Sequence, residues 1–444
     1  MFFGDNMLEN INKAMWVIAT SLIIISSFYF SCSLRFVQLN FKEMFKNLFT
    51  SSGNDRGISP IQSFLMTLGS RIGVGSIAGV ALALYLGGPG SIFWMWISAF
   101  FSAANTFAET VLGIVYRKKD GDEYKGGPSY YLKYGLCKPK LGGLYAILIL
   151  VSYVLGFVGI QGNTITKSFL QIINISPFII GIVLVLITSI VIFGGLKKIA
   201  AFSEKFVPFM TILYVGIAIF VAIKNITLLP SIFLNIVKSA FSLKSAYGGI
   251  LGSLIVGVQR GIFSNEAGLG TGSITSSTSS TDSSVSQGYI QMLGIYVTTI
   301  LICTATVIII MCSDYTTLSL NDVNGIEITQ HAFRYHLGNI GDILLFISVL
   351  LFSYTTILTG YYDGESSLKY FFKNVKNIYL IILKIVSLFV LFLGCVLSSE
   401  KLWSFVDIMM SLLAIINIYA LISLRKNVKE ELEYETIKKC DKID

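Results

Sequence analysis

The segment that decides the fold reads LGSRIGVGSIAG and spans residues 68–79. It lies inside an apolar stretch, 62–86, that is long enough to cross a bilayer, yet it holds four glycines and a full positive charge. Glycine in a helix interior costs about 1 kcal/mol relative to alanine, and hydrocarbon cannot satisfy the backbone groups that a broken helix frees. We therefore predict that this membrane helix is unwound at its middle, where it lines a cavity.

A second interruption of the same kind, QRGIFSNEAGLG at residues 259–270, lies in the apolar stretch 247–272. Packing between small residues would explain the glycines, but not the polar groups of Arg71, Asn265 and Glu266. Broken helices offer free N–H groups and a positive dipole end to a carboxylate, while their freed carbonyls face a cation. The two interruptions therefore predict a zwitterionic substrate and a coupling ion.

The rest of the chain has the composition of a polytopic membrane protein. Of its 444 residues 54% are hydrophobic and 13% are charged, with a mean hydropathy of +0.73, whereas soluble domains have about 25% charged residues. The apolar runs have helical length, which predicts an all-α protein and excludes a β-barrel. We expect about eleven spans, at 14–36, 62–86, 91–116, 142–171, 176–194, 204–223, 247–272, 286–312, 341–361, 378–398 and 402–424.

The distribution of basic residues predicts the orientation in the membrane. Of the 33 Lys and Arg residues, 23 fall on one side of the predicted spans and six on the other. Because basic loops stay in the cytoplasm, the N-terminus is expected outside and the C-terminus inside. The net charge of +8 is then explained by the orientation of the protein in the membrane, and no nucleic-acid partner is expected.

The spacing of the two interruptions predicts an internal repeat within a single transmembrane domain, 1–444. Each interrupted helix opens a set of five spans, at 58–224 and 245–424, preceded by an extra N-terminal helix, 14–36, and followed by a cytoplasmic tail, 425–444. Because five is odd, the second set enters the membrane from the opposite side. Such inverted repeats place their broken helices together near the midplane.

Several other functions are disfavoured. The six cysteines form no C-x-x-C motif and the two histidines, His331 and His336, share one polar segment, so neither a metal site nor catalytic residues are predicted. No enzyme activity and no cofactor are expected. The P-loop motif is absent from the sequence, so transport would draw on an ion or substrate gradient. A channel is disfavoured because no repeated filter loop occurs.

The sequence resembles the sodium:alanine symporter family, also called the alanine or glycine:cation symporters. The resemblance is carried in chain order by ISP at 58–60, IAGV at 77–80, LGGPG at 86–90, EYKGGPSYY at 123–131, FGGLKKI at 193–199, VPFM at 207–210 and RGIFSNEAGLG at 260–270. It implies a LeuT-type fold of five plus five helices in the plasma membrane. It also implies symport, coupled to sodium or to protons, of a small neutral amino acid such as alanine or glycine.

The resemblance also implies site residues. The predicted substrate-binding residues are Arg71, Gly73, Val74, Gly75, Ser76, Thr166, Phe263, Ser264, Asn265, Gly268, Thr356 and Gly360. The predicted cation-binding residues are Gly69, Ile72, Thr355 and Thr356, through carbonyls of the first broken helix and hydroxyls of the eighth core helix. For the two threonines, back-bonding to their own helix is the alternative interpretation.

The sequence departs from the family pattern within this site. Arg71 replaces a small threonine, and Thr166 stands where the family has a glutamine on its third core helix. Gly360 stands where a tryptophan is usual, which predicts a wider pocket, and Thr298 replaces an acid.

Arg71 leaves three interpretations open. It replaces the coupling cation with a fixed charge, binds the substrate carboxylate, or pairs with an acid such as Glu109 or Glu266. The first would make the protein a sodium-independent exchanger or uniporter, and the altered site also permits a transport-inactive sensor. Glu109 is either an ion-pair partner or a proton carrier.

Overall fold

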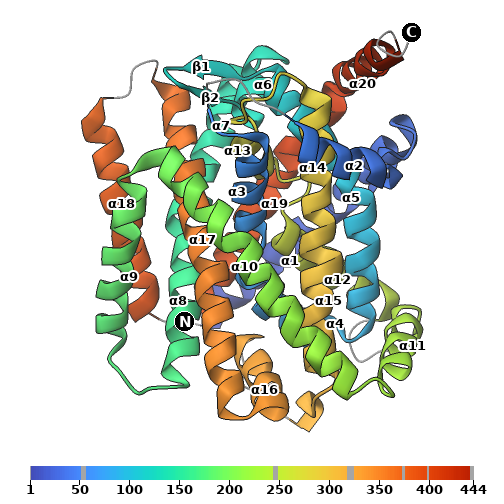
Figure 1. The fold of residues 1–444 in the computed structure, drawn as a ribbon, viewed down its shortest axis with the longest axis vertical. Coiled ribbons are helices and arrows are strands. Elements are labelled where there is room, and N and C mark those ends of the chain that lie inside the picture. Colours follow the sequence, from blue (N-terminus) through green and yellow to red (C-terminus); the bar gives the residue numbers. More distant parts are fainter. Residues whose placement is uncertain are drawn as a thin grey trace.

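The computed structural model of the chain describes residues 2–51, 57–243, 249–317, 325–372, 376–397 and 400–440. These residues are mostly helical, and several long helices, among them α5, α9, α17 and α18, run roughly along the long axis, whereas α10 crosses it diagonally (Figure 1). The regular strands of the described residues, β1 (Lys118–Asp120) and β2 (Glu123–Lys125), form one small antiparallel hairpin. The predicted all-α class is therefore confirmed.

The helices of the first half begin with an extra N-terminal helix and continue through the first interruption. They are α1 (Phe2–Ser33), α2 (Phe41–Thr50), α3 (Pro60–Arg71), α4 (Val80–Gly87), α5 (Gly90–Val115), α6 (Pro128–Tyr134), α7 (Pro139–Ile149), α8 (Val158–Leu170), α9 (Pro177–Ile192), α10 (Gly195–Lys224) and α11 (Leu229–Ala240). Two π-helical segments join them: Gly75–Gly79 precedes α4, and Leu150–Phe157 connects α7 to α8.

The helices of the second half begin at the second interruption. They are α12 (Gly249–Asn265), α13 (Thr271–Ser276), α14 (Ser284–Ile295), α15 (Thr304–Met311), α16 (Gly325–Leu337), α17 (Asn339–Phe371), α18 (Asn377–Val396), α19 (Glu400–Ser423) and α20 (Arg425–Cys440). A π-helical segment, Tyr296–Cys303, joins α14 to α15. Short 3-10 turns occur at Val37–Leu39 and Tyr315–Thr317.

The described residues contain eight helices that are long and apolar enough to cross a membrane, or nine when the bent pair at the first interruption counts as one span. The predicted spans at 176–194 and 247–272 coincide with shorter helices, α9 and α12. The multi-pass class is therefore confirmed, while the number of eleven spans stays a prediction.

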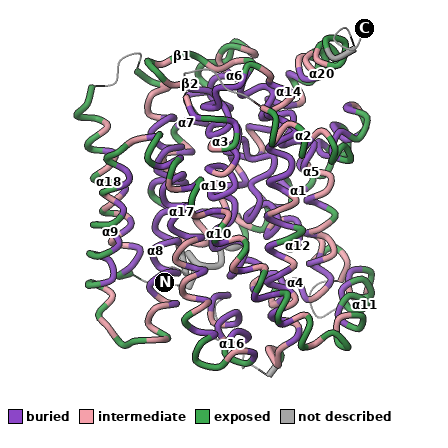
Figure 2. Tube along the Cα trace, viewed as in Figure 1, coloured by how far each residue is buried: buried purple, intermediate pink, exposed green. Residues whose placement is uncertain are grey.

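Residues inside the bundle are buried, and many residues of the outer helices are exposed (Figure 2). Hydrophobic side chains are among those exposed. On the outer faces of α9, α10 and α18, side chains such as Ile190, Ile212 and Phe389 are more than half exposed. Exposed apolar surface of this extent is typical of a protein surrounded by lipid. The arrangement leaves α3 and α12 inside the bundle, where their interruptions avoid lipid.

Two polar segments also form helices. The segment at 313–340, predicted as a polar loop, contains α16, and both His331 and His336 belong to this helix. The charged tail forms α20.

Candidate substrate and cation site

The first interruption begins where α3 ends. Ser59 and Gln62 form a capping box that starts α3. The helix then stops at Arg71, and Ile72 adopts φ −83° and ψ 74°, outside the helical region. The chain resumes in the π-helical segment after a bend of 50°. The predicted break within 68–79 is therefore present, and the non-helical part of it is confined to the residues between Arg71 and Gly75.

The second interruption begins where α12 ends. Glu266 has a left-handed φ of 57°, which is strained for a residue with a side chain, and Gly268 and Gly270 also have positive φ. Glu109 of α5 supports this segment, since its Oε2 accepts hydrogen bonds from Gly270 N at 3.1 Å and Asn417 Nδ2 at 3.2 Å. The carboxylate thus replaces helical hydrogen-bond partners that the broken helix lacks.

The two interruptions meet in the middle of the bundle. The hydroxyls of Ser76 and Ser264 lie 2.7 Å apart. A Cβ atom on Gly75 would lie 2.8 Å from the ring of Phe263 and 3.1 Å from Ser264 Cα. Glycine at position 75 therefore permits the close approach of the two broken helices.

The side chain of Asn265 forms hydrogen bonds at the second break. Its Oδ1 accepts a hydrogen bond from Ala267 N, and its Nδ2 donates to the hydroxyl of Thr299 at 2.9 Å. The carbonyl oxygen of Gly268, three residues further on, accepts a hydrogen bond from Asn417 Nδ2 at 2.9 Å. Asn265 therefore ends α12 and Gly268 lies in the unwound segment, and the polar groups of both residues form hydrogen bonds.

Oxygen atoms converge beside Gly69, on the side of α3 that faces α17. Thr355 Oγ1 lies 2.9 Å from the Gly69 carbonyl oxygen, and Thr356 Oγ1 lies 3.2 Å from the same oxygen and 3.1 Å from that of Ser70. Both hydroxyls also lie 3.0 Å from the carbonyl oxygen of Phe352. A hydroxyl carries one hydrogen, so acceptors outnumber the donors. Such an oxygen-rich cluster suits a hard cation.

Arg71 points away from these oxygens. It is two residues beyond Gly69, a rotation of about 200° on a helix, and its Nη1 donates to the carbonyl of Gln291 on α14 at 3.0 Å. Its guanidinium also lies against the backbone of Gly272 and Gly294. Glu109 and Glu266 act on it electrostatically, although no carboxylate of the described residues forms an ion pair with it.

The structure brings Gln161 to the first break, and not Thr166. Gln161 Oε1 accepts a hydrogen bond from Val74 N at 3.3 Å, and its Nε2 lies close to Gly73, as does the hydroxyl of Thr356. Thr166 lies on another face of α8, beside Cys395 of α18. A glutamine side chain of α8 therefore reaches the first break, five residues before the predicted position Thr166.

Gly360 does not border open space. A Cβ atom there would lie 3.5 Å from the ring of Tyr153, and 4.0 Å from Val158. Tyr153 also stacks on Phe157 with ring centroids 4.6 Å apart, and Phe157 stacks on Phe263 at 5.3 Å. The wider pocket predicted from Gly360 is therefore filled by Tyr153, which the sequence did not indicate because its contact partner is 207 residues away.

The aromatic stack continues to a buried ion pair. Phe263 stacks on Trp403 of α19 at 5.0 Å, and Arg260, one turn before Phe263, pairs with Asp407, one turn after Trp403. Gln259 also donates to Asp407, at 3.1 Å. These contacts hold α12 against α19 directly beside the meeting point of the two broken helices.

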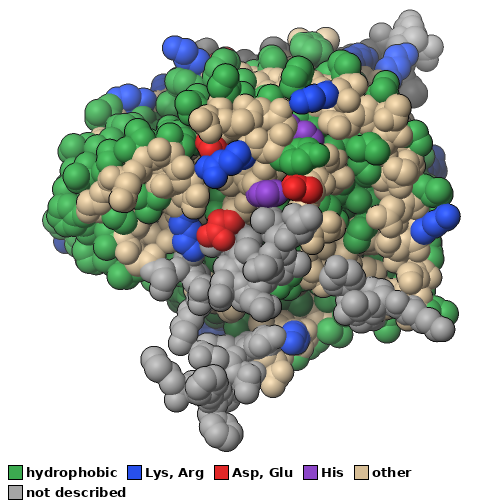
Figure 3. All heavy atoms as spheres, turned by 90° about the horizontal axis from the view of Figure 1, so that it is seen from below, with side chains coloured by type: hydrophobic (Ala, Val, Ile, Leu, Met, Phe, Trp, Pro, Cys, Tyr) green, Lys and Arg blue, Asp and Glu red, His purple; other side chains and the backbone are tan. Residues whose placement is uncertain are grey.

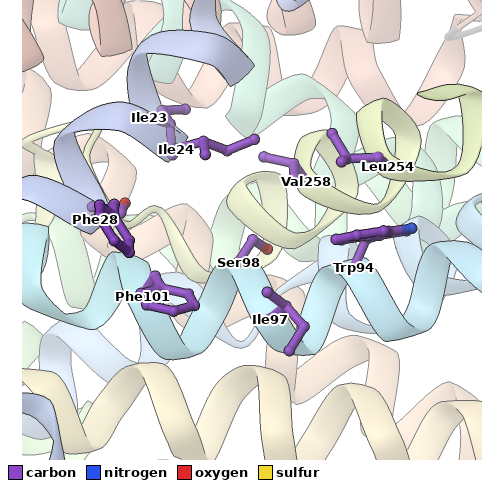
Figure 4. Close-up of a pocket in the computed structure, with 10 residues that line it drawn as sticks. Ile23, Ile24, Phe28, Trp94, Ile97, Ser98, Phe101, Leu254 and Val258 are labelled. Atoms are coloured by element: carbon purple, nitrogen blue, oxygen red, sulfur yellow. The ribbon is translucent and has the colours of Figure 1, made fainter. Parts of the chain in front are cut away.

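A separate cavity of about 200 Å³ lies between α1, α5 and α12 (Figure 4). Its walls are side chains such as Ile23, Phe28, Trp94 and Phe101. It offers almost no polar groups for a charged ligand and contains no predicted site residue. The meeting point of the broken helices therefore remains the candidate site.

The comparisons with known proteins agree with this geometry. Residues 1–443 match the sequence profile of the sodium:alanine symporter family. The chain belongs to the sodium:alanine symporter family. It is therefore a transport protein of the cation-coupled amino-acid symport class and not an enzyme, and sodium is the coupling ion that the family indicates.

Relatives of this symporter match along most of their length. The probable sodium/glutamine symporter GlnT of Bacillus subtilis is 38% identical over 438 residues, which cover 97% of this chain and 91% of that protein. The sodium/alanine symporter AgcS of Methanococcus maripaludis is 35% identical, with 86% and 84% covered. A crystal structure of MhsT in complex with L-phenylalanine has a TM-score of 0.63 at 13% identity, with 84% of this chain and 90% of that chain covered. This likeness confirms the predicted LeuT-type fold.

Proposed function

We propose that this symporter carries a small neutral amino acid, such as alanine or glycine, together with sodium across the plasma membrane by alternating access. The observation that carries the proposal is the meeting of the two broken helices at Ser76 and Ser264, next to the oxygen cluster around Gly69. A substrate held between two half-helices can be released to either side when one repeat moves against the other.

The substrate carboxylate is proposed to bind at the first break, where the half-helix dipole favours an anion. It would replace the acceptors that the backbone N–H groups have in this structure, namely the carbonyls of Arg71 and Gly73 and the Oε1 of Gln161. This assigns Gly73, Val74, Gly75 and Ser76 to the carboxylate, and Ser264 to the opposite wall. Phe263 is proposed to contact the substrate side chain, since its ring lies against Gly75. Gln161 joins this set through its contact with Val74.

Sodium is proposed to bind Gly69, Ile72, Thr355 and Thr356. The carbonyl and hydroxyl oxygens near Gly69 support this assignment, as does the non-helical conformation of Ile72, which removes its carbonyl from the helical hydrogen-bond pattern. Sodium is preferred over a proton because these groups are neutral oxygens that do not titrate at physiological pH.

The proposed repeats are residues 58–224 and 245–424, with the N-terminus outside and the C-terminus in the cytoplasm. The end with β1, β2 and α20 carries basic residues such as Arg117, Lys118 and Lys119 (Figure 1). At the α16 end, hydrophobic and neutral side chains cover most of the visible surface, and basic side chains are scattered (Figure 3). This charge asymmetry supports the orientation.

Two alternative functions are not favoured. A sodium-independent exchanger requires Arg71 to replace the cation, but the guanidinium contacts Gln291 on the other side of α3 from Thr355. A transport-inactive sensor is opposed by relatives that are named as symporters and carriers.

The proposal is tested with the purified full-length protein in liposomes. We expect accumulation of radiolabelled alanine or glycine when the outside buffer contains sodium, and none when choline replaces sodium. Arg71→Gln should keep the sodium requirement, whereas Thr356→Val should weaken it. Equal uptake in sodium and choline would contradict sodium coupling, and saturable binding without accumulation would favour a sensor.

A further inference from the structure

The membrane span that contains α14 and α15 touches both broken helices with one of its faces. Thr299, Cys303 and Thr306 follow one another at intervals of four and three residues, so their side chains lie on one face of this span, Ser284–Met311. All three residues are 0% exposed. The segment Tyr296–Cys303 is π-helical, a rare geometry that occurs frequently at functional sites. None of the three is among the site residues predicted from the sequence.

The two outer residues of this face hold one break each. The hydroxyl of Thr306 lies 2.8 Å from the carbonyl oxygen of Ser76, and it donates its hydrogen to that oxygen. The hydroxyl of Thr299 accepts a hydrogen bond from Asn265 Nδ2 at 2.9 Å. The span therefore forms side-chain hydrogen bonds to the first break and to the second break at the same time.

Cys303, between them, lies where the two breaks meet. Its Sγ atom is 3.2 Å from the hydroxyl of Ser264, and that hydroxyl is 2.7 Å from the hydroxyl of Ser76. The Ser76 hydroxyl also lies 3.5 Å from the carbonyl oxygen of Arg71. Each of the three side chains carries one hydrogen on its oxygen or sulfur atom. Three different elements of the fold thus bring one O–H or S–H group each to the same point.

The chemistry of these three groups suits an anionic ligand. Each group can turn its hydrogen from a neutral neighbour to an anion, and hydrogen bonds to a charged acceptor are roughly twice as strong as neutral ones. Ser76 also lies in the first turn of the half-helix that continues into α4, where the helix dipole favours negative charge. A hard cation such as sodium prefers oxygen ligands, so the sulfur of Cys303 disfavours a cation at this point.

We propose that Cys303 is a substrate-binding residue whose thiol, together with the hydroxyls of Ser76 and Ser264, binds the carboxylate of the transported amino acid. The span that contains α14 and α15 is then a third wall of the site, beside the two broken helices. The substrate exchanges its own contacts for the contact between the two serine hydroxyls, because no substrate atom fits between oxygens 2.7 Å apart. The inference rests on the proposed function, since it names a further contact for the same substrate.

The first test measures sodium-driven uptake of alanine by the purified full-length protein in liposomes. We expect Cys303→Ala to raise the KM for alanine about fivefold and to leave the maximal rate unchanged, because the thiol contributes to binding. Cys303→Ser supplies a hydroxyl donor in place of the thiol and should restore the KM. Cys312→Ala is the matched control, because Cys312 is a second buried cysteine close to the same span. That variant should behave as the wild type does.

A second test separates contact with the carboxylate from an indirect effect on the site. Alaninamide keeps the ammonium group and the methyl group of alanine, but a neutral amide replaces its carboxylate. We expect Cys303→Ala to weaken inhibition of uptake by unlabelled alanine about fivefold and to leave inhibition by alaninamide unchanged. An equal loss of affinity for both inhibitors would show that the thiol only supports the packing of the site, and it would overturn the inference.

The outcomes separate this inference from the proposed function. An unchanged KM in Cys303→Ala, with normal uptake by the wild type, overturns the contact with Cys303 and leaves the proposed function intact. A raised KM that Cys303→Ser does not restore also overturns it, because a hydrogen-bond donor would then not be what the site requires. Cys303→Val, which has a similar shape and no donor, replaces Cys303→Ala if that variant does not fold. A wild type that accumulates neither alanine nor glycine in sodium contradicts the proposed function itself.

Discussion

The hydroxyls of Ser76 and Ser264 lie 2.7 Å apart although 188 residues separate them in the chain. Each belongs to a broken helix, and each break frees backbone polar groups that hydrocarbon could not satisfy. We propose that a polar substrate is held inside the membrane at this contact. The neighbouring Gly75 has no side chain to keep the two segments apart.

Gly75 is predicted to be intolerant of a methyl group. In Gly75→Ala the new Cβ would lie 2.8 Å from the ring of Phe263 and 3.1 Å from the backbone of Ser264. We expect overpacking of about 1–3 kcal/mol and a loss of uptake in liposomes. Gly79→Ala is the matched control, because nothing lies within 4 Å of a Cβ there. Normal uptake by both variants would show that the two breaks need not approach so closely.

Thr355 and Thr356 are predicted to bind sodium through their hydroxyls. Thr356→Val keeps the shape of the side chain but removes the oxygen that approaches Gly69 and Ser70. We expect the sodium concentration for half-maximal uptake to rise about tenfold, which corresponds to about 1.4 kcal/mol. Thr356→Ser keeps the oxygen and should retain the affinity. An unchanged sodium dependence in the valine variant would place the ion elsewhere.

Substitutions at Gln161 and Thr166, both on α8, are predicted to differ in their effect on amino-acid binding. Gln161→Leu leaves the Val74 amide without its side-chain acceptor, a loss of about 1–3 kcal/mol for a buried polar group. We expect amino-acid binding to weaken at least tenfold, measured by the ligand-dependent rise in melting temperature. Thr166→Val, beside Cys395, should bind normally. The reverse result would return Thr166 to the substrate site.

The buried His336 of α16 is predicted to lower the free energy of unfolding in acid. Burial lowers the pKa of its imidazole from 6.5, despite a contact of 2.9 Å between its Nε2 and the Ile309 carbonyl oxygen. The unfolded chain then binds a proton more readily than the folded protein. This contribution to stability is complete above about pH 6.5 and declines as the pH falls below it. The melting temperature of wild type should fall more steeply between pH 8 and pH 5 than that of His336→Gln; parallel curves would contradict the assignment.

The sequence by itself determined the membrane class and the two breaks. Both are local properties, because the apolar runs, the glycines at 69–79 and the polar groups at 259–270 are continuous in the chain. Backbone groups that cannot be satisfied in hydrocarbon restrict such segments to a cavity, whatever surrounds them. The family resemblance also predicted that Gly69, Thr355 and Thr356 lie together, and the structure shows their contacts.

Only the tertiary structure decided which side chains face the site. Thr166 is five residues after Gln161, a rotation of about 140° on a helix, so a small alignment shift exchanges a site residue for one that contacts α18. Arg71 turns toward Gln291 because the helix ends there and α14 is its neighbour. Tyr153 fills the space beside Gly360 from a helix far away in sequence. Such directions depend on packing between helices, and no local pattern encodes them.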